Sequence, residues 1–153
     1  MLNKIIRSLI LLILFGCVSN AADVKPSKMA SDFFHMPSSD QVKQFKNHRL
    51  DEQYELFIFG NQVVHPPATH LATSFAEQGP IIVPFLKSKL KATQEEITVR
   101  DIVLVLSRLA QLKLYDFSKD EELMGLLDKR VNDMHGIWKK TTREMISVIH
   151  SVH

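Results

Sequence analysis

The segment from Glu95 to Leu112 constrains the fold of this chain more than any other. Apolar residues recur along it at spacings of three and four: Val99, Ile102, Val103, Leu106, Leu109 and Ala110. This spacing places one apolar stripe along a helix of about five turns. The opposite face is polar, with Arg100, Asp101, Ser107, Arg108 and Gln111. Because further apolar residues widen the stripe, the helix is predicted to lie at the centre of the core.

A second helix is predicted to precede this one and to fold back on it. Gly79 suits the left-handed position that closes a helix, and a proline such as Pro80 is tolerated at the start of the next. Pro84 also belongs in a first turn, which places the helix start near Val83. Leu86 and Leu90 are then predicted to face inward, and the lysines at 87, 89 and 91 to face water.

The two predicted helices carry the pattern Gly79…Val83-Pro84-x-Leu86-x-x-x-Leu90, then Glu96-x-x-Val99-Arg100 and Leu106-x-x-Leu109. This pattern resembles one unit of a HEAT-type helical repeat, over residues 79–112. The resemblance implies a short α-solenoid, an architecture that usually holds another macromolecule. No strict internal repeat is visible, so an irregular helical bundle remains the alternative.

The N-terminal residues resemble an export signal. Lys4 and Arg7 precede an apolar run that is too short to span a bilayer. Residues 14–17, Leu-Phe-Gly-Cys, resemble a bacterial lipobox, which predicts a signal peptide of residues 1–16 and a lipid on Cys17. Val18 after the cysteine, by the same resemblance, favours the outer membrane facing the periplasm. The alternative is cleavage after Ala21 or Ala22, which would give a soluble periplasmic or secreted protein.

Cysteine count and charge limit the possible partners. Cys17 is the only cysteine, so a disulfide within the chain is impossible. Removing residues 1–16 takes away Lys4 and Arg7 and no acid, so 19 basic residues become 17 against 17 acidic ones. A neutral chain lacks the basic field on which nucleic-acid binding depends. The sequence therefore predicts no nucleic-acid partner.

Residues 17–37 are mixed and polar and are predicted to form a flexible tether, although Phe33 and Phe34 are expected to pack onto the domain. Residues 38–153 are predicted to form an all-α domain of six or seven helices. Within it, residues 54–64 fit either a helix or a β-hairpin, and the helical neighbours favour the helix. Helix starts are predicted at Ser38 and Pro67 and at two capping-box patterns, Thr93–Glu96 and Ser118–Glu121, with a last helix from about Ile137.

Residues with catalytic or metal-binding chemistry are scattered. The carboxylate pairs 51–52, 95–96 and 121–122 each fall in a predicted first helical turn, where negative charge is favourable whatever the function. His65 and His70 are five residues apart across a proline break, and the HExxH and GxSxG patterns are absent. The sequence therefore predicts no enzyme, no cofactor and no metal site.

The function predicted from these features is a non-catalytic, lipid-anchored helical module that binds another envelope protein, as a scaffold, an assembly factor or an inhibitor. The partner-binding residues expected from the sequence are His65, Pro66, Pro67, His70 and Trp138. Trp138 has a second interpretation, as a core residue at the start of the last helix. The alternative function is a small periplasmic enzyme or metal-binding protein that uses His65 and His70.

Overall fold

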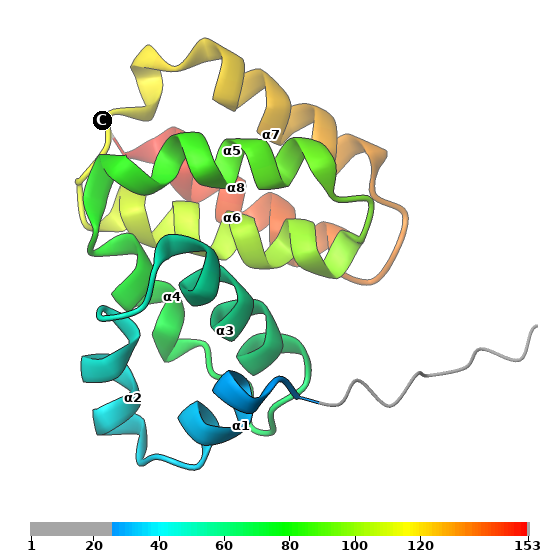
Figure 1. Cartoon of the computed structure of the whole chain (residues 1–153). Helices are drawn as coiled ribbons and strands as arrows, with labels where there is room; N and C mark the ends of the chain where they lie inside the picture. Colours follow the sequence, from blue (N-terminus) through cyan, green and yellow to red (C-terminus); the bar gives the residue numbers. More distant parts are fainter. Residues whose placement is uncertain (1–25, 153) are drawn as a thin grey trace, which may run out of the picture.

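The computed structural model describes residues 26–152 and contains only helices and their connections over that range (Figure 1). Eight α-helices and two short 3-10 helices follow one another along the described residues. The predicted all-α fold is therefore confirmed. The leader, the lipobox and Cys17 lie outside these residues.

Four helices form the N-terminal part of the fold: α1 (Lys28–Phe34), α2 (Ser38–Phe45), α3 (Leu50–Gln62) and α4 (His70–Ala76). One phenylalanine from each contributes to a buried aromatic cluster. The ring centres of Phe45 and Phe75 are 5.7 Å apart, and those of Phe57 and Phe75 are 6.1 Å apart. Aromatic pairs at such distances hold helices together through their large buried area. Because α3 continues to Gln62, the helical alternative for residues 54–64 is confirmed.

Helix α1 occupies part of the segment that was predicted to be a tether. Phe33 is buried, and the Phe34 ring lies 5.7 Å from that of Phe59 in α3. Gly60 permits this approach, because a Cβ at that position would lie 2.5 Å from the Phe34 ring. The tether prediction is wrong for residues 28–34, since burying these rings stabilises a helix there. The expectation that both phenylalanines pack onto the domain is confirmed.

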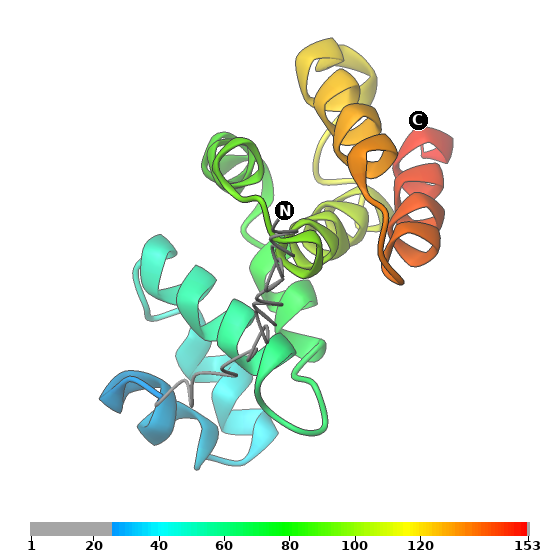
Figure 2. The same cartoon turned by 90° about the vertical axis from the view of Figure 1, so that its right-hand side faces the viewer.

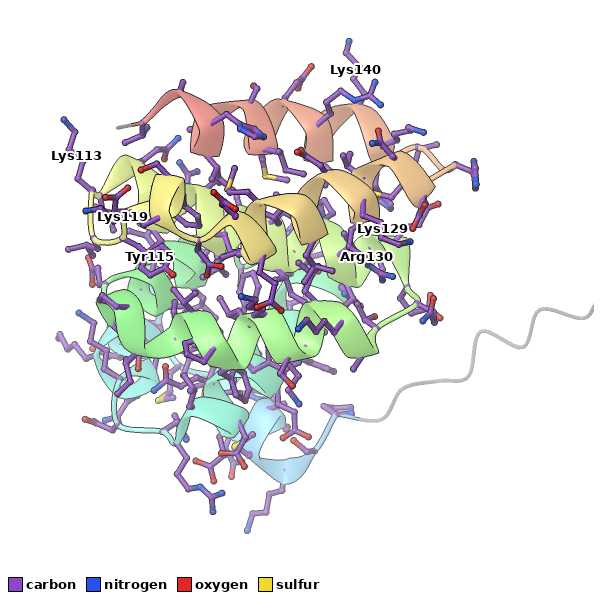
Figure 3. The ribbon with its side chains drawn as sticks, turned by 90° about the horizontal axis from the view of Figure 1, so that it is seen from above. Lys113, Tyr115, Lys119, Lys129, Arg130 and Lys140 are labelled. Carbon is purple, nitrogen blue, oxygen red and sulfur yellow. The ribbon has the colours of Figure 1, made fainter. Side chains whose placement is uncertain are left out.

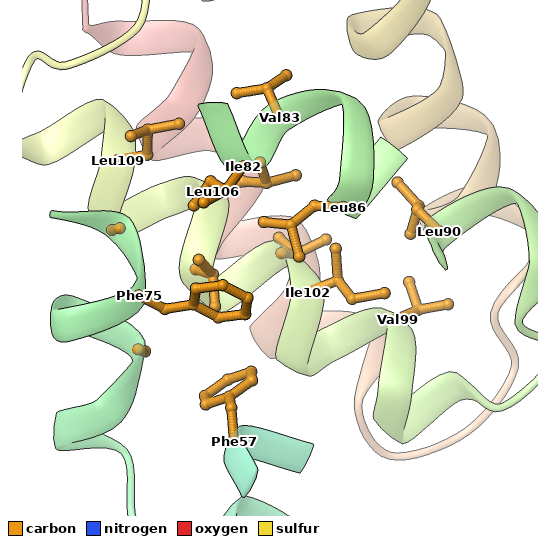
Figure 4. Close-up of a cluster of buried hydrophobic side chains, with 14 of the residues drawn as sticks. Phe57, Phe75, Ile82, Val83, Leu86, Leu90, Val99, Ile102, Leu106 and Leu109 are labelled. Carbon is orange, nitrogen blue, oxygen red and sulfur yellow. The ribbon is translucent and has the colours of Figure 1, made fainter. Parts of the chain in front are cut away.

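The predicted central pair of helices is present. A 3-10 turn η1 (Gly79–Ile82) leads into α5 (Val83–Ala92), and α6 (Glu96–Gln111) follows. Gly79 has φ of +73°, the left-handed conformation expected for it. Leu86 and Leu90 point from α5 toward Ile102 and Val99 of α6 (Figure 4).

Helix α6 is the centre of the core, as predicted. It packs against α3, α4, α5 and α8. Nine of its residues are buried: Val99, Asp101, Ile102, Val103, Val105, Leu106, Ser107, Leu109 and Ala110. Two members of this set, Asp101 and Ser107, belong to the face that was predicted to be polar. Contact with α3 and α8 therefore covers a side of the helix that its apolar stripe alone would leave in water.

The C-terminal part consists of η2 (Phe117–Lys119), α7 (Glu121–Asp133) and α8 (Lys139–Ser151). An ion-pair cluster joins α5 to the start of α7: Lys87 Nζ lies 3.0 Å from Asp120 and 2.8 Å from Glu122. The Lys87 side chain is only 17% exposed. The prediction that Lys87 faces water is therefore wrong, because the acidic start of α7 covers it.

Helices α4, α6 and α8 lie side by side in one row, and α3, α5 and α7 lie along one side of that row (Figures 1 and 2). Each pair α3–α4, α5–α6 and α7–α8 is consecutive in sequence and in contact. Helix α6 lies between α4 and α8 in this row and also packs against α3 and α5, which explains why it is buried so completely.

Both predicted capping boxes are wrong. At α6, Glu96 does not turn back to its own helix start; it accepts hydrogen bonds from the loop before α8. At α7, the cap is Asp120, whose carboxylate accepts from Leu123 N–H at 3.0 Å. Residues 117–119 form η2 instead, which moves the helix start by two residues. Helix α4 likewise begins at His70 and not at Pro67.

Candidate functional site

A buried carboxylate lies where α3 crosses α6. Asp101 has no exposed surface, and its oxygens accept hydrogen bonds from Asn61 at 2.5 Å and from Gln62 at 2.8 Å. The Arg100 guanidinium, 2.5 Å away, supplies the opposite charge. Burial raises the pKa of Asp101, while the Gln62 hydrogen bond and the Arg100 charge act in the opposite direction. These contacts connect α3 to α6 through a single side chain.

The same cluster positions Arg100 beneath Trp138. The guanidinium carbon lies 4.4 Å from the centre of the Trp138 ring, within the range of a cation–π interaction. The ion pair with Asp101 holds the same guanidinium, so the indole packs on a charged group that is itself fixed. Trp138 immediately precedes α8 and is half-buried against the core. Of its two sequence interpretations, packing against the core at the start of the last helix is the one that the structure supports.

Glu96 fixes the loop between α7 and α8. Its carboxylate accepts from the backbone N–H of His135 at 2.6 Å and of Gly136 at 2.8 Å. These hydrogen bonds, the one from His135 most of all, lower the pKa of Glu96. A Cβ at position 136 would lie 2.5 Å from the Glu96 carboxylate, so a larger residue there would displace the end of the Glu96 side chain. The loop is therefore tied to α6 immediately before Ile137 and Trp138.

Ile137 is the most exposed large apolar residue of the described chain, at 83%. Three basic residues follow it on the first turns of α8: Lys139, Lys140 and Arg143. We call these four residues the basic corner. They border an open hollow of about 460 Å³, which Gly136, Glu144 and Ser147 also line. Lys140 extends outward from α8 (Figure 3).

A smaller hollow of about 190 Å³ lies between α6 and α8. It shares Glu144 with the first hollow, so the two adjoin along α8. Its lining combines partly exposed apolar residues with polar ones: Leu104, Ser107, Arg108, Gln111, Thr141, Met145 and Val148. The surface beside the basic corner therefore presents both apolar and polar side chains from α6 and α8.

The structure does not unite the residues expected to bind a partner. His65, Pro66, Pro67 and His70 are exposed between α3 and the first residue of α4, whereas Trp138 precedes α8. Desolvation lowers the pKa of His70. Within residues 26–152, neither His65 nor His70 forms a hydrogen bond or ion pair with a carboxylate, and no three His, Cys, Asp or Glu side chains meet as metal ligands would.

Sequence reasoning missed two features of this site. Asp101 was placed on the solvent face of α6, although it is buried, and its partners Asn61 and Gln62 are forty and thirty-nine residues away in sequence. Ile137 was taken only as the start of a helix. One local signal was present: Ile137-Trp138 sits between a glycine and two lysines, which is unusual for a core segment.

Comparisons with known proteins add no relatives. The chain matches no protein-family model, and neither the curated proteins nor the solved structures include a significant match. In residues 26–152, no helix has both the length and the apolar character needed to cross a membrane.

Proposed function

We propose that this protein is exported, is anchored by a lipid on Cys17, and binds another envelope protein without catalysing a reaction. Export and anchoring rest on the basic and apolar leader and on the lipobox-like residues 14–17. Binding rests on the helical architecture and on the basic corner. The organism would thereby hold a partner protein close to the membrane.

The arrangement of the helices supports the likeness to a HEAT-type solenoid. Three consecutive helix pairs stack so that α4, α6 and α8 form one row, and stacked pairs are the principle of such repeats. Helices α1 and α2 also contact each other, and they pack on α3 and α4 at the N-terminal end of the stack. We therefore propose a short solenoid of consecutive helix pairs.

The observation that carries the binding function is the exposure of Ile137 on a fixed support. Large apolar residues anchor protein interfaces best when their position is set before the partner arrives. Here Glu96 holds the preceding loop, and the Arg100–Asp101 pair holds Trp138 next to Ile137. The free protein thus presents an apolar side chain in a defined position, and binding would cost little ordering of this loop.

No specific observation favours the alternative function, a periplasmic enzyme or metal-binding protein. That function needs His65 or His70 to meet acidic side chains around a pocket. Both histidines are exposed in the connection from α3 to α4 and in the first residue of α4.

The test of the binding function compares two exposed isoleucines. Ile81 in η1 is 72% exposed and Ile137 is 83% exposed. Each is changed to serine in the full chain, which is tagged and purified from envelopes solubilised in a non-ionic detergent. We expect the wild type and Ile81→Ser to retain one envelope protein in stoichiometric amount, and Ile137→Ser to lose it. Retention of no such protein by the wild type, or equal retention by both variants, would refute the proposal.

A further inference from the structure

The basic side chains of the basic corner differ from most lysines of the described chain in forming no ion pair. Elsewhere, most lysines are neutralised by nearby acids: Lys43 by Asp40, Lys46 by Glu77, Lys87 and Lys91 by Glu122, Lys119 by Asp116, and Lys129 by Asp133. Among residues 26–152, neither Lys139, Lys140 nor Arg143 forms an ion pair. These three positive charges are therefore not neutralised by ion pairs within residues 26–152.

Internal groups do little to neutralise the corner. Lys139 Nζ donates to the backbone carbonyl of Asn132 at 3.0 Å, which orients the amine and leaves its charge in place. Glu96 is the nearest acid to the loop, and its oxygens are already engaged by two backbone N–H groups. Glu144 lines the hollow without forming an ion pair with Lys140, one turn before it. The corner retains an excess of positive charge.

The hollow and the exposed Ile137 place a second requirement on a ligand of the basic corner, which must also offer an apolar group of suitable size. The basic side chains surround a hollow of about 460 Å³, and Ile137 stands at its edge. A hollow of this size admits a short stretch of polypeptide with one or two side chains. We propose that the basic corner binds an acidic segment of the partner protein, in which carboxylates face Lys140 and Arg143 and an apolar side chain covers Ile137. This inference rests on the proposed function.

An acidic polypeptide fits the corner better than an anionic membrane surface does. A bilayer presents a broad plane of phosphates and engages basic residues spread over a protruding face. The three basic residues here span little more than one turn of α8 and border a concavity that also contains Glu144. A polypeptide can avoid Glu144 or donate an N–H to it, whereas a sheet of phosphates would be repelled by it.

Trp138 allows binding to be measured directly, because it is the only tryptophan in the chain and adjoins Ile137. The probe is a tryptophan-free peptide of repeated Leu-Glu-Glu triplets, with Leu-Lys-Lys triplets as its charge-reversed partner. Each is titrated into the full chain in a non-ionic detergent while the fluorescence of Trp138 is followed. We expect the acidic peptide to bind at low salt and to weaken as salt screens its charges, and the basic peptide not to bind.

Charge reversal tests whether the corner is the site. Lys140→Glu/Arg143→Glu should weaken the acidic peptide at least about tenfold and should allow the basic peptide to bind. The matched control is Lys28→Glu/Lys113→Glu, which changes the net charge equally at exposed lysines on other parts of the surface. Circular dichroism of both double variants verifies that each remains helical. Equal weakening by both double variants would overturn the proposal, as would acidic and basic peptides binding alike.

Two further outcomes separate this inference from the proposed function. If the envelope protein retained by the wild type is also retained by Lys140→Glu/Arg143→Glu, the binding function stands and the acidic-segment proposal fails. If vesicles of phosphatidylglycerol shift the Trp138 fluorescence of the wild type but not of the charge-reversed variant, while the acidic peptide does nothing, the corner binds lipid and the proposal is again overturned.

Discussion

Asp101 shows how one polar side chain organises the contact between three helices. In place of water, its carboxylate is contacted by the side chains of Asn61 and Gln62 of α3 and of Arg100 of α6. Arg100 in turn packs against Trp138, which precedes α8. A buried charge is tolerated only where such partners satisfy it. Removing the carboxylate would leave the Arg100 charge and the Asn61 amide donor without an acceptor, and Gln62 would keep only its hydrogen bond to Thr98.

Asp101→Ala should therefore lower the free energy of unfolding by about 3 kcal/mol, the cost of breaking a buried pair by removing one partner. The matched control is Asp128→Ala. Asp128 is exposed and lies 3.2 Å from His150, so its loss should change stability by less than about 0.5 kcal/mol. Urea denaturation of both variants measures the difference. Equal effects would show that Asp101 is not structurally distinct from a surface acid.

Glu96 gives a pH-dependent prediction. Its pKa is lowered in the folded protein by the N–H groups of His135 and Gly136, so its charge stabilises the fold above the ordinary glutamate pKa. That contribution is lost as the pH falls through the lowered pKa. The stability difference between wild type and Glu96→Gln should therefore be largest at neutral pH and shrink below about pH 4.5. A difference that stays constant from neutral to acidic pH would contradict this account.

At the scale of the element, helix ends are set by backbone conformation and by side chains that satisfy free N–H groups. Gly79 and Gly125 illustrate the two opposite roles of glycine. Gly79 has φ of +73° between α4 and α5, and Gly125 lies inside α7; no atom would be within 4 Å of a Cβ at either position. A methyl group at either position would therefore meet no other side chain. The effect of an alanine on stability then depends only on the backbone conformation at that position.

Gly79→Ala should destabilise the protein by about 1 kcal/mol, because alanine is strained in the left-handed conformation. Gly125→Ala should stabilise it by about 0.5 to 1 kcal/mol, because alanine loses less backbone entropy inside a helix. Thermal unfolding of the two variants provides the comparison. Shifts of the same sign would rule out this explanation of the α4–α5 connection.

Local sequence patterns predicted most helices of the protein correctly but did not predict how their ends are capped. The spacing of apolar residues predicted α5, α6 and the inward positions of Leu86 and Leu90, and the helical neighbours predicted the helical state of α3. The capping-box patterns failed, because the donors that Glu96 satisfies belong to a loop forty residues away. A local motif identifies a side chain able to accept, and the tertiary fold decides which N–H groups reach it.

For the whole molecule, lipidation at Cys17 is the prediction that places the helical domain in the cell. Cys17→Ser in the full chain should abolish lipid attachment, which would change migration in gels and shift the protein from the membrane fraction to the soluble fraction. The control is Phe15→Ala, which keeps the cysteine. If Cys17→Ser fractionates and migrates like the wild type, the anchor is absent and a leader cut after Ala21 or Ala22 is favoured.

The sequence alone determined that the chain is helical and that α6 is its centre, because helical periodicity and side-chain hydrophobicity are properties of neighbouring residues. It also indicated that Phe33 and Phe34 would pack onto the domain. It did not predict α1, whose seven residues show no sustained apolar period. This helix packs its aromatic rings on the domain, and Gly60 leaves space for the Phe34 ring beside α3.

The tertiary structure alone decided the polar chemistry. The burial of Asp101, its contact with Asn61 and Gln62, and the attachment of Glu96 to the loop before α8 all join residues far apart in sequence. The basic corner emerged in the same way, because whether a lysine is neutralised depends on which acids lie near it in space. Apolar burial follows a local pattern, whereas ion pairs and buried hydrogen bonds need specific partners that only the packed helices bring together.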